Sequence, residues 1–420
     1  MTDPQTRASL VGQKGSRVAV SVLPYAAGSA YSGGSARRIQ LTRAVGQVGD
    51  HTLVVLAEVD AATRRDLAEV FDAEVVCAPV RKRSRARALA YWLVHPTVPW
   101  SASRTDYSEA RACLRATAKT GRPRVIWCNG VQAWPGIPRE LRGLAVIDAH
   151  DLPSKNQSEL LRASMRRWMR RRRQPRQGEA LGPPVALKEV LLASDAALRC
   201  RLLEQQIARQ SRALVLSSEI EAGGLRGSVV VPNGASEPAT EPRPASQTRF
   251  VFPGQFRYPP NIDGAEWLAL EVLPLLRRVM DDPVVVLAGS GSDRLASFAQ
   301  QHGIDVTGFV QDFDEVYDSA TVVVVPLLSG SGTRIKILEA WARGLPVVST
   351  TKGAEGLGAV HGETALLVDT PADFAQACAD VAASPELRAR LGLRGRQRFE
   401  LGGSWAQSQA GLLRWLRGAP

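Results

Sequence analysis

A run of small residues stands directly before a charged segment late in the chain. The run SGSGT covers residues 329–333, and Lys336 and Glu339 follow it three residues apart. Glycines let backbone amides approach an anion, and a helix beginning here would add about half a positive charge at its N-terminus. On that helix the cation could meet a diphosphate while the carboxylate accepts hydrogen bonds from two ribose hydroxyls. The alternative is a solvated Lys–Glu pair worth roughly 0.2–0.5 kcal/mol.

Length and composition indicate two packed domains. The chain has 420 residues, 45% of them hydrophobic, which suits two cores of about 200 residues each. The five cysteines show no CxxC spacing and are odd in number, so we expect no disulfide framework or zinc site and a reducing compartment. No uninterrupted apolar segment approaches the ~18–20 residues that cross a bilayer, and the first thirty residues lack a signal-peptide core. We therefore expect a cytoplasmic protein.

The net charge of +12 is concentrated in two segments. Arg162–Arg176 holds eight arginines and no acid, and Arg81–Arg87 holds five basic residues and no acid. Trp168 lies within the first segment, and Trp92 and Trp100 follow the second. Basic residues beside tryptophans favour an anionic membrane surface as partner, which would place the protein peripherally on the inner face of the cell membrane. Nucleic acid is the less favoured partner, and a solvated arginine-rich helix or disordered loop is the alternative.

Apolar runs alternate with helical spacing along the chain. A strand, a glycine-rich loop and a helix open the pattern at Val18–Leu23 and Ala36–Val48, which is how a Rossmann-like unit begins. Repeated alternation of this kind predicts parallel sheets covered by helices. The further strands are expected at Thr52–Ala57, Glu74–Ala78, Val125–Cys128, Ala145–Ile147, Ala213–Ser217, Ser228–Val231, Arg249–Phe252, Val284–Ala288, Asp305–Thr307, Thr321–Val325 and Pro346–Ser349.

The segment Ser329–Leu357, SGSGTRIKILEAWARGLPVVSTTKGAEGL, closely resembles the nucleotide-binding signature of retaining glycosyltransferases of the GT-B fold, in particular family 4 of group 1 type. The resemblance covers nearly the whole second half in the order of the family, and the first half more weakly. The other matching segments are Phe250–Leu276, Val284–Ser292, Val306–Thr333 and Val360–Ala377 in the second half, and Tyr31–Ile39, Ile147–Ser154 and Val229–Ser236 in the first.

The resemblance implies an α/β protein with two Rossmann-like domains whose parallel sheets face each other across a cleft. Combined with the apolar pattern, it divides the chain into five parts. These are a disordered N-terminus at 1–16, an acceptor-side domain at 17–231 with an arginine-rich insertion near 162–180, a proline-rich linker at 232–247, a nucleotide-sugar-binding domain at 248–402, and a helix at 403–420 that crosses back to the first domain.

Glu339 matches the glutamate that binds the donor ribose in the family. Its alternative role is an ion pair with Arg343, one helical turn later. Many relatives carry a second glutamate, which contacts the sugar, eight positions earlier, where this chain has Ser331. The resemblance therefore implies that backbone amides at Gly332 and Thr333 take over that contact.

Three cations are available to stabilise the charge that grows on the β-phosphate, which is the largest catalytic demand. They are Lys336, Arg334 and Arg257. Relatives often carry an Arg and a Lys in the loop that here holds Arg257, and this chain departs from that pattern, so Lys336 is favoured over Arg257. Arg257 either contacts the donor or braces the linker. The tripeptide Gly308-Phe309-Val310 resembles the loop whose backbone recognises the base.

The first domain is expected to contribute two further groups. Gly33 and Gly34 match the glycine loop that approaches the diphosphate across the cleft, with a simple turn as the alternative. His150 aligns with a catalytic histidine near the donor sugar and the acceptor, although a lone histidine is often structural. Asp151 either orients that ring or caps the next helix.

The reaction implied by the family is transfer of a hexose from a nucleotide-diphosphate sugar to a saccharide or lipid-linked acceptor, with retention of configuration, in cell-surface polysaccharide synthesis. No metal and no cofactor beyond this co-substrate are expected, and Asp312 and Asp314 are interpreted as turn and cap residues. The alternatives are glycosylation of a small secondary metabolite and a non-catalytic protein that binds anions or nucleic acid. A dehydrogenase is disfavoured because the first glycine loop lacks GxGxxG spacing.

Overall fold

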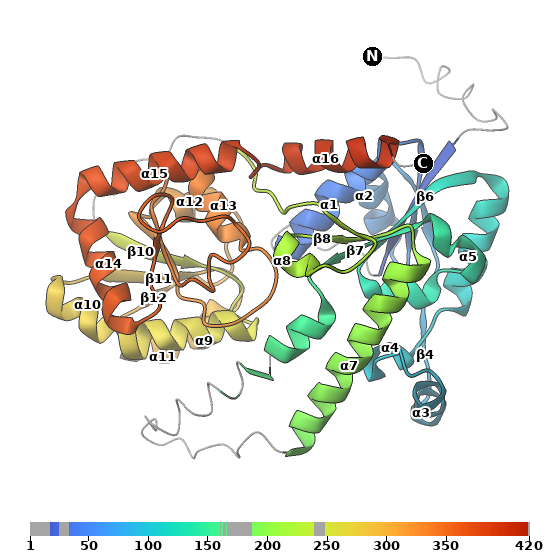
Figure 1. Cartoon of the computed structure of the whole chain (residues 1–420), viewed down its shortest axis with the longest axis horizontal. Helices are drawn as coiled ribbons and strands as arrows, with labels where there is room; N and C mark the ends of the chain where they lie inside the picture. Colours follow the sequence, from blue (N-terminus) through green and yellow to red (C-terminus); the bar gives the residue numbers. More distant parts are fainter. Residues whose placement is uncertain are drawn as a thin grey trace, which may run out of the picture.

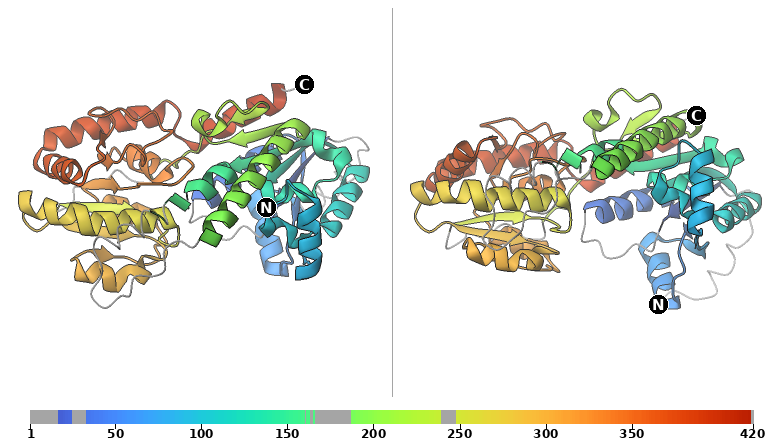
Figure 2. Two further views of the ribbon diagram at one scale, coloured as in Figure 1. Left: turned by 60° about the horizontal axis from the view of Figure 1, so that its bottom comes forward. Right: turned by 90° about the horizontal axis from the view of Figure 1, so that it is seen from below.

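The computed structural model describes residues 17–24, 33–159, 161–162, 165, 187–238 and 248–418. The N-terminus predicted to be disordered, most of the arginine-rich segment Arg162–Arg176 and the later part of the linker lie outside the described residues. The described chain forms two α/β lobes, which lie side by side in Figure 1 and from two further directions in Figure 2.

The first lobe is built on a sheet of seven described strands in the order β3-β2-β1-β6-β7-β8-β9, all parallel. Its central strands are apolar runs buried on both faces, as parallel strands covered by helices must be. The strands are β1 (Arg17–Leu23), β2 (Asp50–Val55), β3 (Glu74–Cys77), β6 (Arg122–Asn129), β7 (Ala145–His150), β8 (Ala213–Leu216) and β9 (Ser228–Val230).

Helices and short 3-10 turns connect these strands. Asp60 caps the second helix by accepting a hydrogen bond of 2.7 Å from the backbone N–H of Thr63. The connecting elements are α1 (Gly33–Gly46), α2 (Ala61–Phe71), α3 (Arg85–Val94), α4 (Trp100–Ser103), α5 (Ser108–Thr120), η2 (Val131–Gly136), η3 (Arg139–Leu144), α7 (Leu187–Gln210) and α8 (Glu219–Ala222), with a small antiparallel pair formed by β4 (Arg81–Lys82) and β5 (Thr105–Asp106).

The second lobe holds six described strands in the order β12-β11-β10-β13-β14-β15, again all parallel. The strands are β10 (Arg249–Pro253), β11 (Val284–Ala288), β12 (Asp305–Val306), β13 (Val322–Val325), β14 (Val347–Ser349) and β15 (Leu366–Leu367). The helical elements are α9 (Pro259–Trp267), η4 (Leu268–Val272), α10 (Leu273–Val279), η5 (Ser292–Leu295), α11 (Ala296–Gln301), α12 (Phe313–Asp318), α13 (Ile335–Ala342), α14 (Pro371–Ala383), α15 (Pro385–Glu400) and α16 (Trp405–Gly418).

The predicted fold class is confirmed, and the strands lie where the apolar runs indicate. The short strands β4, β5 and β15 are not predicted from the sequence. In each sheet the strand order reverses once, at β1/β6 in the first and at β10/β13 in the second. Loops at the carboxyl ends of parallel strands open a crevice at such a reversal, which is where α/β proteins bind ligands.

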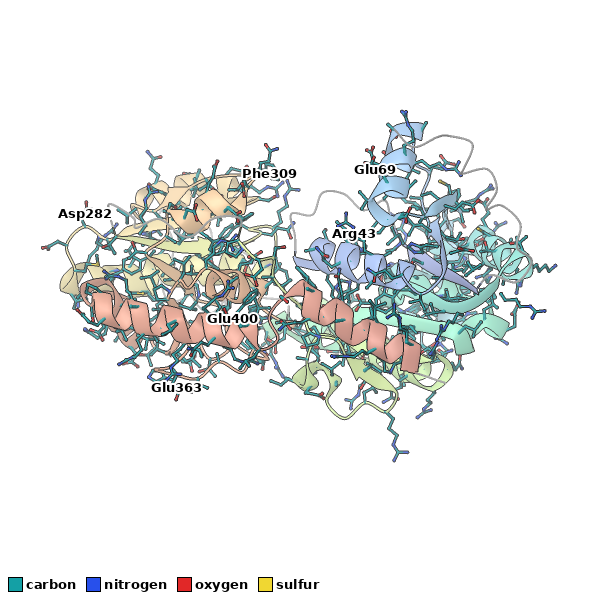
Figure 3. All side chains as sticks on the ribbon, turned by 90° about the horizontal axis from the view of Figure 1, so that it is seen from above. Arg43, Glu69, Asp282, Phe309, Glu363 and Glu400 are labelled. Carbon is teal, nitrogen blue, oxygen red and sulfur yellow. The ribbon has the colours of Figure 1, made fainter. Side chains whose placement is uncertain are left out.

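The chain passes between the lobes twice, and the two crossings touch. Ala235 and Ser404 form a parallel bridge, and a Cβ at Gly234 would lie 2.4 Å from the backbone nitrogen of Trp405. The last helix, α16, then packs on α1, so that Leu412 and Leu416 join the core of the first lobe. Figure 3 shows α15 and α16 following one another across the two lobes, with α16 beside the helix that carries Arg43.

Within the described ranges, no helix combines the length and apolar character needed to cross a bilayer. The five cysteines, all described, are free thiols: Cys77, Cys113, Cys128, Cys200 and Cys378.

Candidate active site between the two lobes

The small-residue loop follows β13 at the strand reversal of the second sheet. Gly330 and Gly332 have φ values of 113° and 78°, a region that other residues rarely adopt. Arg334 folds back inside this loop, where its guanidinium donates to the carbonyls of Gly330, Ser331 and Gly332. Burial lowers the pKa of Arg334. The structure thus places Arg334 as an internal brace of the loop rather than as an open cation.

Lys336 lies in the first turn of α13, beside the loop that follows β10. Its Nζ atom donates to Oδ1 of Asn261 at 3.1 Å and lies 4.4 Å from the ring centroid of Phe252. Asn261 is held in turn by donating to the carbonyl of Gln255 at 2.8 Å. No carboxylate among the described residues forms an ion pair with Lys336. Burial, and secondarily the charge of Arg334, lower the pKa of Lys336 to about 7.

Glu339 is oriented by a tyrosine from the neighbouring helix α12. The hydroxyl of the fully buried Tyr317 donates to Oε2 of Glu339 at 2.7 Å. Burial raises the pKa of Glu339, and the Tyr317 hydrogen bond opposes that shift. Arg343 donates to the backbone carbonyl of Glu339 and pairs with Asp314, so the alternative Glu339–Arg343 ion pair does not form. The carboxylate of Glu339 is therefore held in one orientation, with one of its two oxygens accepting the hydrogen bond from Tyr317.

Asp312 and Asp314 differ in their roles. Asp312 caps α12 by accepting from the backbone N–H of Asp314 at 2.8 Å, which confirms its interpretation as a cap. Asp314, interpreted from the sequence as a turn or cap residue, instead pairs through its side chain with Arg343.

The other predicted donor residues of the second lobe line the same sheet edge. Arg257 is exposed, and its stem lies against Gly291, where a Cβ would come within 3.1 Å of Cγ. The N–H of Gly308 donates to Oγ of Ser292 at 2.9 Å. Phe309 is 60% exposed at the edge of the second lobe that faces the first (Figure 3), while Val310 packs on the core.

His150 ends β7 on the opposite side of the cleft. Its φ of 62° is unusual for a side-chain-bearing residue, and its Nε2 atom lies 3.7 Å from Oδ2 of the fully buried Asp148. Burial lowers the pKa of His150, and Asp148 opposes that shift. Gly33 and Gly34 are the first two residues of α1. The loop before them lies outside the described residues.

Sequence reasoning did not identify a buried ion pair beneath His150. Arg37 of α1 pairs with Asp148 at 2.8 Å, and both side chains are fully buried. The second arm of Arg37 donates to the carbonyl of Val231 and to Oδ1 of Asn233, each at 2.8 Å. This pair ties α1 and β7 to the start of the interdomain connection.

Carboxylates of the first lobe meet the small-residue loop directly. Ser331 donates from Oγ to Oδ2 of Asp151 at 2.8 Å. The N–H of Gly332 lies 3.3 Å from Oε1 of Glu221, and that of Gly330 lies 3.4 Å from Oε2 of Glu159. Sequence reasoning considered Asp151 only as an orienting or capping residue and missed both glutamates, because nothing in their local sequence marks them. The amides of Gly330 and Gly332 thus face carboxylate oxygens in this structure.

A cavity of about 810 Å³ opens beside this contact on the first-lobe side. It is walled by α7, α8, residues 152–159 and Arg162, and it reaches Gly330 and Ser331. Charged residues of both signs line it, including Lys155, Arg162, Arg201, Lys352, Glu204 and Glu221. Closely placed donors and acceptors of this kind suit a hydroxyl-rich molecule.

The arrangement combines three chemical groups at one sheet edge. Loop amides and Lys336 can bind phosphate oxygens, Glu339 can accept from hydroxyls, and exposed Phe309 offers an aromatic face. No group of three or more His, Cys, Asp or Glu side chains suited to a metal ion occurs among the described residues.

The chain is similar to known proteins both in sequence and in fold. Residues 247–384 match the family model of glycosyl transferases group 1. A stretch of 135 residues is 27% identical to an uncharacterized 44.6 kDa protein in the cps region of Klebsiella pneumoniae. This match covers 30% of the present chain and spans about a third, 35%, of that relative.

Solved structures match over nearly the whole chain. Anabaena HepE in complex with UDP-glucose aligns with a TM-score of 0.61 at 12% identity, covering 96% of this chain and 100% of that one. Sucrose-phosphate synthase from Thermosynechococcus elongatus gives 0.59 at 16% identity, with coverage of 96% and 100%. A glycosyltransferase from Rickettsia africae gives 0.60 at 11% identity, with coverage of 97% and 100%. At such identities the likeness establishes the fold, and the chain has the GT-B fold.

Within the second lobe, residues 247–384 are similar to group 1 glycosyl transferases, which confirms the predicted resemblance for that stretch.

Proposed function

We propose that this protein is a metal-independent, retaining hexosyltransferase of family 4. It moves a sugar from a nucleotide-diphosphate sugar to a saccharide or lipid-linked acceptor. The observation that carries the proposal is Lys336, a cation without a carboxylate partner among the described residues, placed beside the amides of the small-residue loop. The similarity of residues 247–384 to group 1 glycosyl transferases and the complex of HepE with UDP-glucose support a nucleotide-sugar donor.

Each group of the second lobe has a role toward this donor. Lys336 and the amides of Gly332 and Thr333 bind the diphosphate and the sugar, with Ser331 donating its hydroxyl. Glu339 accepts from the ribose hydroxyls with the carboxylate that Tyr317 orients. Phe309 and its neighbours Gly308 and Val310 contact the base, and Arg257 reaches the donor from the opposite loop. Arg334 acts through the loop that it braces.

In the transfer step, the bond between the anomeric carbon and the β-phosphate oxygen breaks while the acceptor oxygen bonds to that carbon on the same face. The departing phosphate takes the proton of the acceptor hydroxyl, so no separate strong base is needed. The negative charge that develops on the phosphate is stabilised by Lys336 and by loop amides, which are fixed before the reaction. His150 of β7 lies on the first-lobe side, next to the sugar, with Gly33 and Gly34 near the diphosphate.

The acceptor binds in the 810 Å³ cavity, which adjoins Ser331 and carries both donors and carboxylates for saccharide hydroxyls. The similarity to a protein in a cps region supports a place in cell-surface polysaccharide synthesis.

We also propose that the protein works in the cytoplasm, bound peripherally to the inner face of the membrane. Helix α3 supports this, because Leu89, Leu93 and Val94 are 47%, 64% and 71% exposed beside exposed Arg85 and Arg87. Helices α3 and α4 lie together at one edge of the first lobe in Figure 1.

Not every cation of this segment is available. Arg81 pairs with Glu109 of α5, and Arg83 lies 3.7 Å from Asp106 of β5. Both acids lie outside the segment Arg81–Arg87, which itself contains none, in elements that follow in the sequence.

The decisive experiment is a screen of nucleotide sugars for thermal stabilisation and slow donor hydrolysis. We expect at least one to raise Tm and to be hydrolysed. Glu339→Ala should lose turnover at unchanged Tm, whereas Glu315→Ala, at an exposed position of α12, should keep it. A protein that binds nucleic acid would be indifferent to both changes, and absence of any stabilising nucleotide sugar would overturn the proposal.

Two further measurements test the finer parts of the proposal. Full loss of activity in a chelator, restored by Mg²⁺ or Mn²⁺, would contradict metal independence. Binding to anionic liposomes at low salt should fall when Arg85 and Arg87 are both changed to Gln, and failure of the unaltered protein to bind such liposomes would remove the membrane assignment.

A further inference from the structure

The first lobe contains a second cavity, of about 380 Å³, that shares no lining residue with the cleft cavity. Both cavities border α7, but Leu203 and Gln206 lie on the other side of that helix from Leu198 and Arg201. The remaining walls come from α3, α5, η2 and η3. This second cavity, here called the arginine pocket, therefore stands apart from the proposed transferase site.

Four arginines line the arginine pocket, and no acidic side chain does so among the described residues. Arg115 is paired with Glu140 outside the lining, at 2.7 Å. Arg111 donates to the carbonyl of Pro135 at 3.0 Å and lies 4.0 Å from Asp106. Arg139 is exposed, and Arg142 lies deeper. Like charges gathered around a small cavity repel each other unless an anion lies between them.

Hydrogen-bond donors in the same wall provide an independent observation. Trp134 is only 2% exposed, and its indole N–H has no acceptor among the described residues. The buried Nε of Arg142 likewise has none, although its other arm donates to Oε1 of Gln210 at 2.7 Å. The Arg142 guanidinium lies 4.5 Å from the Trp134 ring centroid. Buried donors are almost always satisfied in folded proteins, so these two indicate a ligand that accepts hydrogen bonds.

The electrostatic surroundings of Arg142 agree with this geometry. Burial and the neighbouring charge of Arg139 lower the pKa of Arg142, with a further contribution from Arg111 in the same direction. A bound anion would relieve the penalty that both effects impose.

We propose that the arginine pocket binds a phosphate or diphosphate group. Forked guanidinium donors match the oxygens of such an anion, and several arginines together suit a multiply charged group better than a single carboxylate. The phosphate belongs either to a lipid headgroup or to a free phosphorylated molecule. Tyr91 of α3 and His95, the C-cap of that helix, line the pocket, and α3 exposes Leu93 and Val94, so a headgroup could reach it from a membrane surface.

Calorimetric titration of the intact protein with inorganic pyrophosphate tests the proposal. We expect Arg139→Gln to weaken pyrophosphate binding about tenfold, as loss of a charge-assisted hydrogen bond does. Arg65→Gln removes the same charge from an exposed position of α2, far along the chain from the pocket lining, and should have no effect. Equal affinities of these two variants would overturn the proposal.

The titration is repeated in a Lys336→Met background, because the donor cleft also attracts pyrophosphate. The difference between Arg139→Gln and Arg65→Gln should persist there, and this holds whether or not the protein proves to be a transferase. If Lys336→Met alone abolishes all pyrophosphate binding, the arginine pocket is not a phosphate site.

A second variant keeps the packing of the pocket intact. Trp134→Phe removes the indole N–H but keeps an aromatic ring, and we expect affinity for pyrophosphate to fall roughly threefold or more with Tm little changed. An unchanged affinity at unchanged Tm would contradict a role for this donor.

Vesicles distinguish the two sources of the phosphate. If a lipid supplies it, Arg139→Gln should bind vesicles of phosphatidic acid in phosphatidylcholine more weakly than Arg65→Gln does. If a free molecule supplies it, only pyrophosphate binding should fall. A fall in neither assay would overturn the assignment.

Discussion

Two cations, Arg37 fully buried and Lys336 partly buried, occupy comparable places in the two lobes, and their surroundings differ. Arg37 of the first lobe pairs with Asp148, and its other arm donates to Val231 and Asn233. Lys336 of the second lobe has a hydrogen bond to Asn261 and the ring of Phe252 nearby, and no ion pair with any described carboxylate. Both lie near the carboxyl ends of parallel strands at the reversal of the strand order.

The contrast separates structural charge from binding charge. A buried cation whose donors are all engaged can only hold elements together, whereas one whose charge is left without a counterion is prepared for an anionic ligand. The amides of the small-residue loop resemble Lys336 in this respect. They lie 3.3 and 3.4 Å from carboxylate oxygens of the other lobe, which is beyond the usual hydrogen-bond range, so they too are prepared for an anionic ligand.

The largest expected effect comes from breaking the engaged pair. Arg37→Met leaves Asp148 buried and unpaired, which should lower the free energy of unfolding by about 3–5 kcal/mol. Arg43→Met, at an exposed position of the same helix, is the control. It should change the free energy of unfolding by less than about 0.5 kcal/mol. Chemical denaturation measures both, and equal stabilities would show that the pair is not structural.

Lys336→Met should affect activity rather than stability. Removing the cation that stabilises the departing phosphate should lower kcat roughly 100- to 1000-fold, while the unfolding free energy stays level because the charge removed is partly buried and has no carboxylate partner among the described residues. Steady-state kinetics and thermal unfolding check the two parts. A loss of stability comparable to that of Arg37→Met would erase the contrast between the two cations.

The pH dependence of UDP binding sharpens the comparison further. With the pKa of Lys336 at about 7 in the free protein, the lysine loses its charge as pH rises above that value. UDP binds the charged form, so its affinity should fall by up to about tenfold per pH unit above pH 7, until the higher pKa of the complex is reached. Lys336→Arg keeps its charge throughout and should give a flat profile from pH 7 to 9 in calorimetric titrations.

Glu339→Gln should weaken UDP binding by about tenfold. A hydrogen bond to a charged acceptor contributes a net free energy of roughly 1.5 kcal/mol, which corresponds to that factor. Tyr317→Phe leaves the carboxylate charged but free to rotate, so its effect should be smaller and in the same direction. UDP and pyrophosphate titrations compared side by side check the assignment, since pyrophosphate lacks the ribose and should be insensitive to both changes.

The smallest effect is expected at Ser331. Its hydroxyl donates to Asp151 across the cleft, and Ser331→Ala should change the KM for the donor sugar by roughly two- to threefold, as loss of one neutral donor does. Asp151→Asn keeps a side-chain acceptor and should have a smaller effect. A larger loss with Ser331→Ala than with Lys336→Met would reverse the order of importance proposed for the two residues.

The sequence predicted what depends on local spacing. Lys336 and Glu339 are three positions apart, which puts them on one face of a helix, and the glycines before them were expected to let backbone amides approach an anion. It could not predict Asn261 or Tyr317 as their partners, because these come from other helices and their identity depends on tertiary packing.

The same limit explains the misplaced and missed residues. Arg334 reads as a cation facing the donor, yet its guanidinium folds back onto carbonyls only two to four residues away. Arg37 and Asp148 are separated by 111 positions, and neither carries a local signal of pairing. Glu159 and Glu221 acquire their significance only when the two lobes are brought together.

Helix α16 has a consequence for how the protein is made. Leu412 and Leu416 complete the core cluster that contains Leu41, Val45 and Trp127 of the first lobe. While the ribosome is still translating the second lobe, that face of the first sheet lacks its cover and exposes apolar side chains. The lobe synthesised first is therefore the one that finishes folding last, so a nascent chain stalled before residue 405 should need chaperones although its whole first sheet has already emerged.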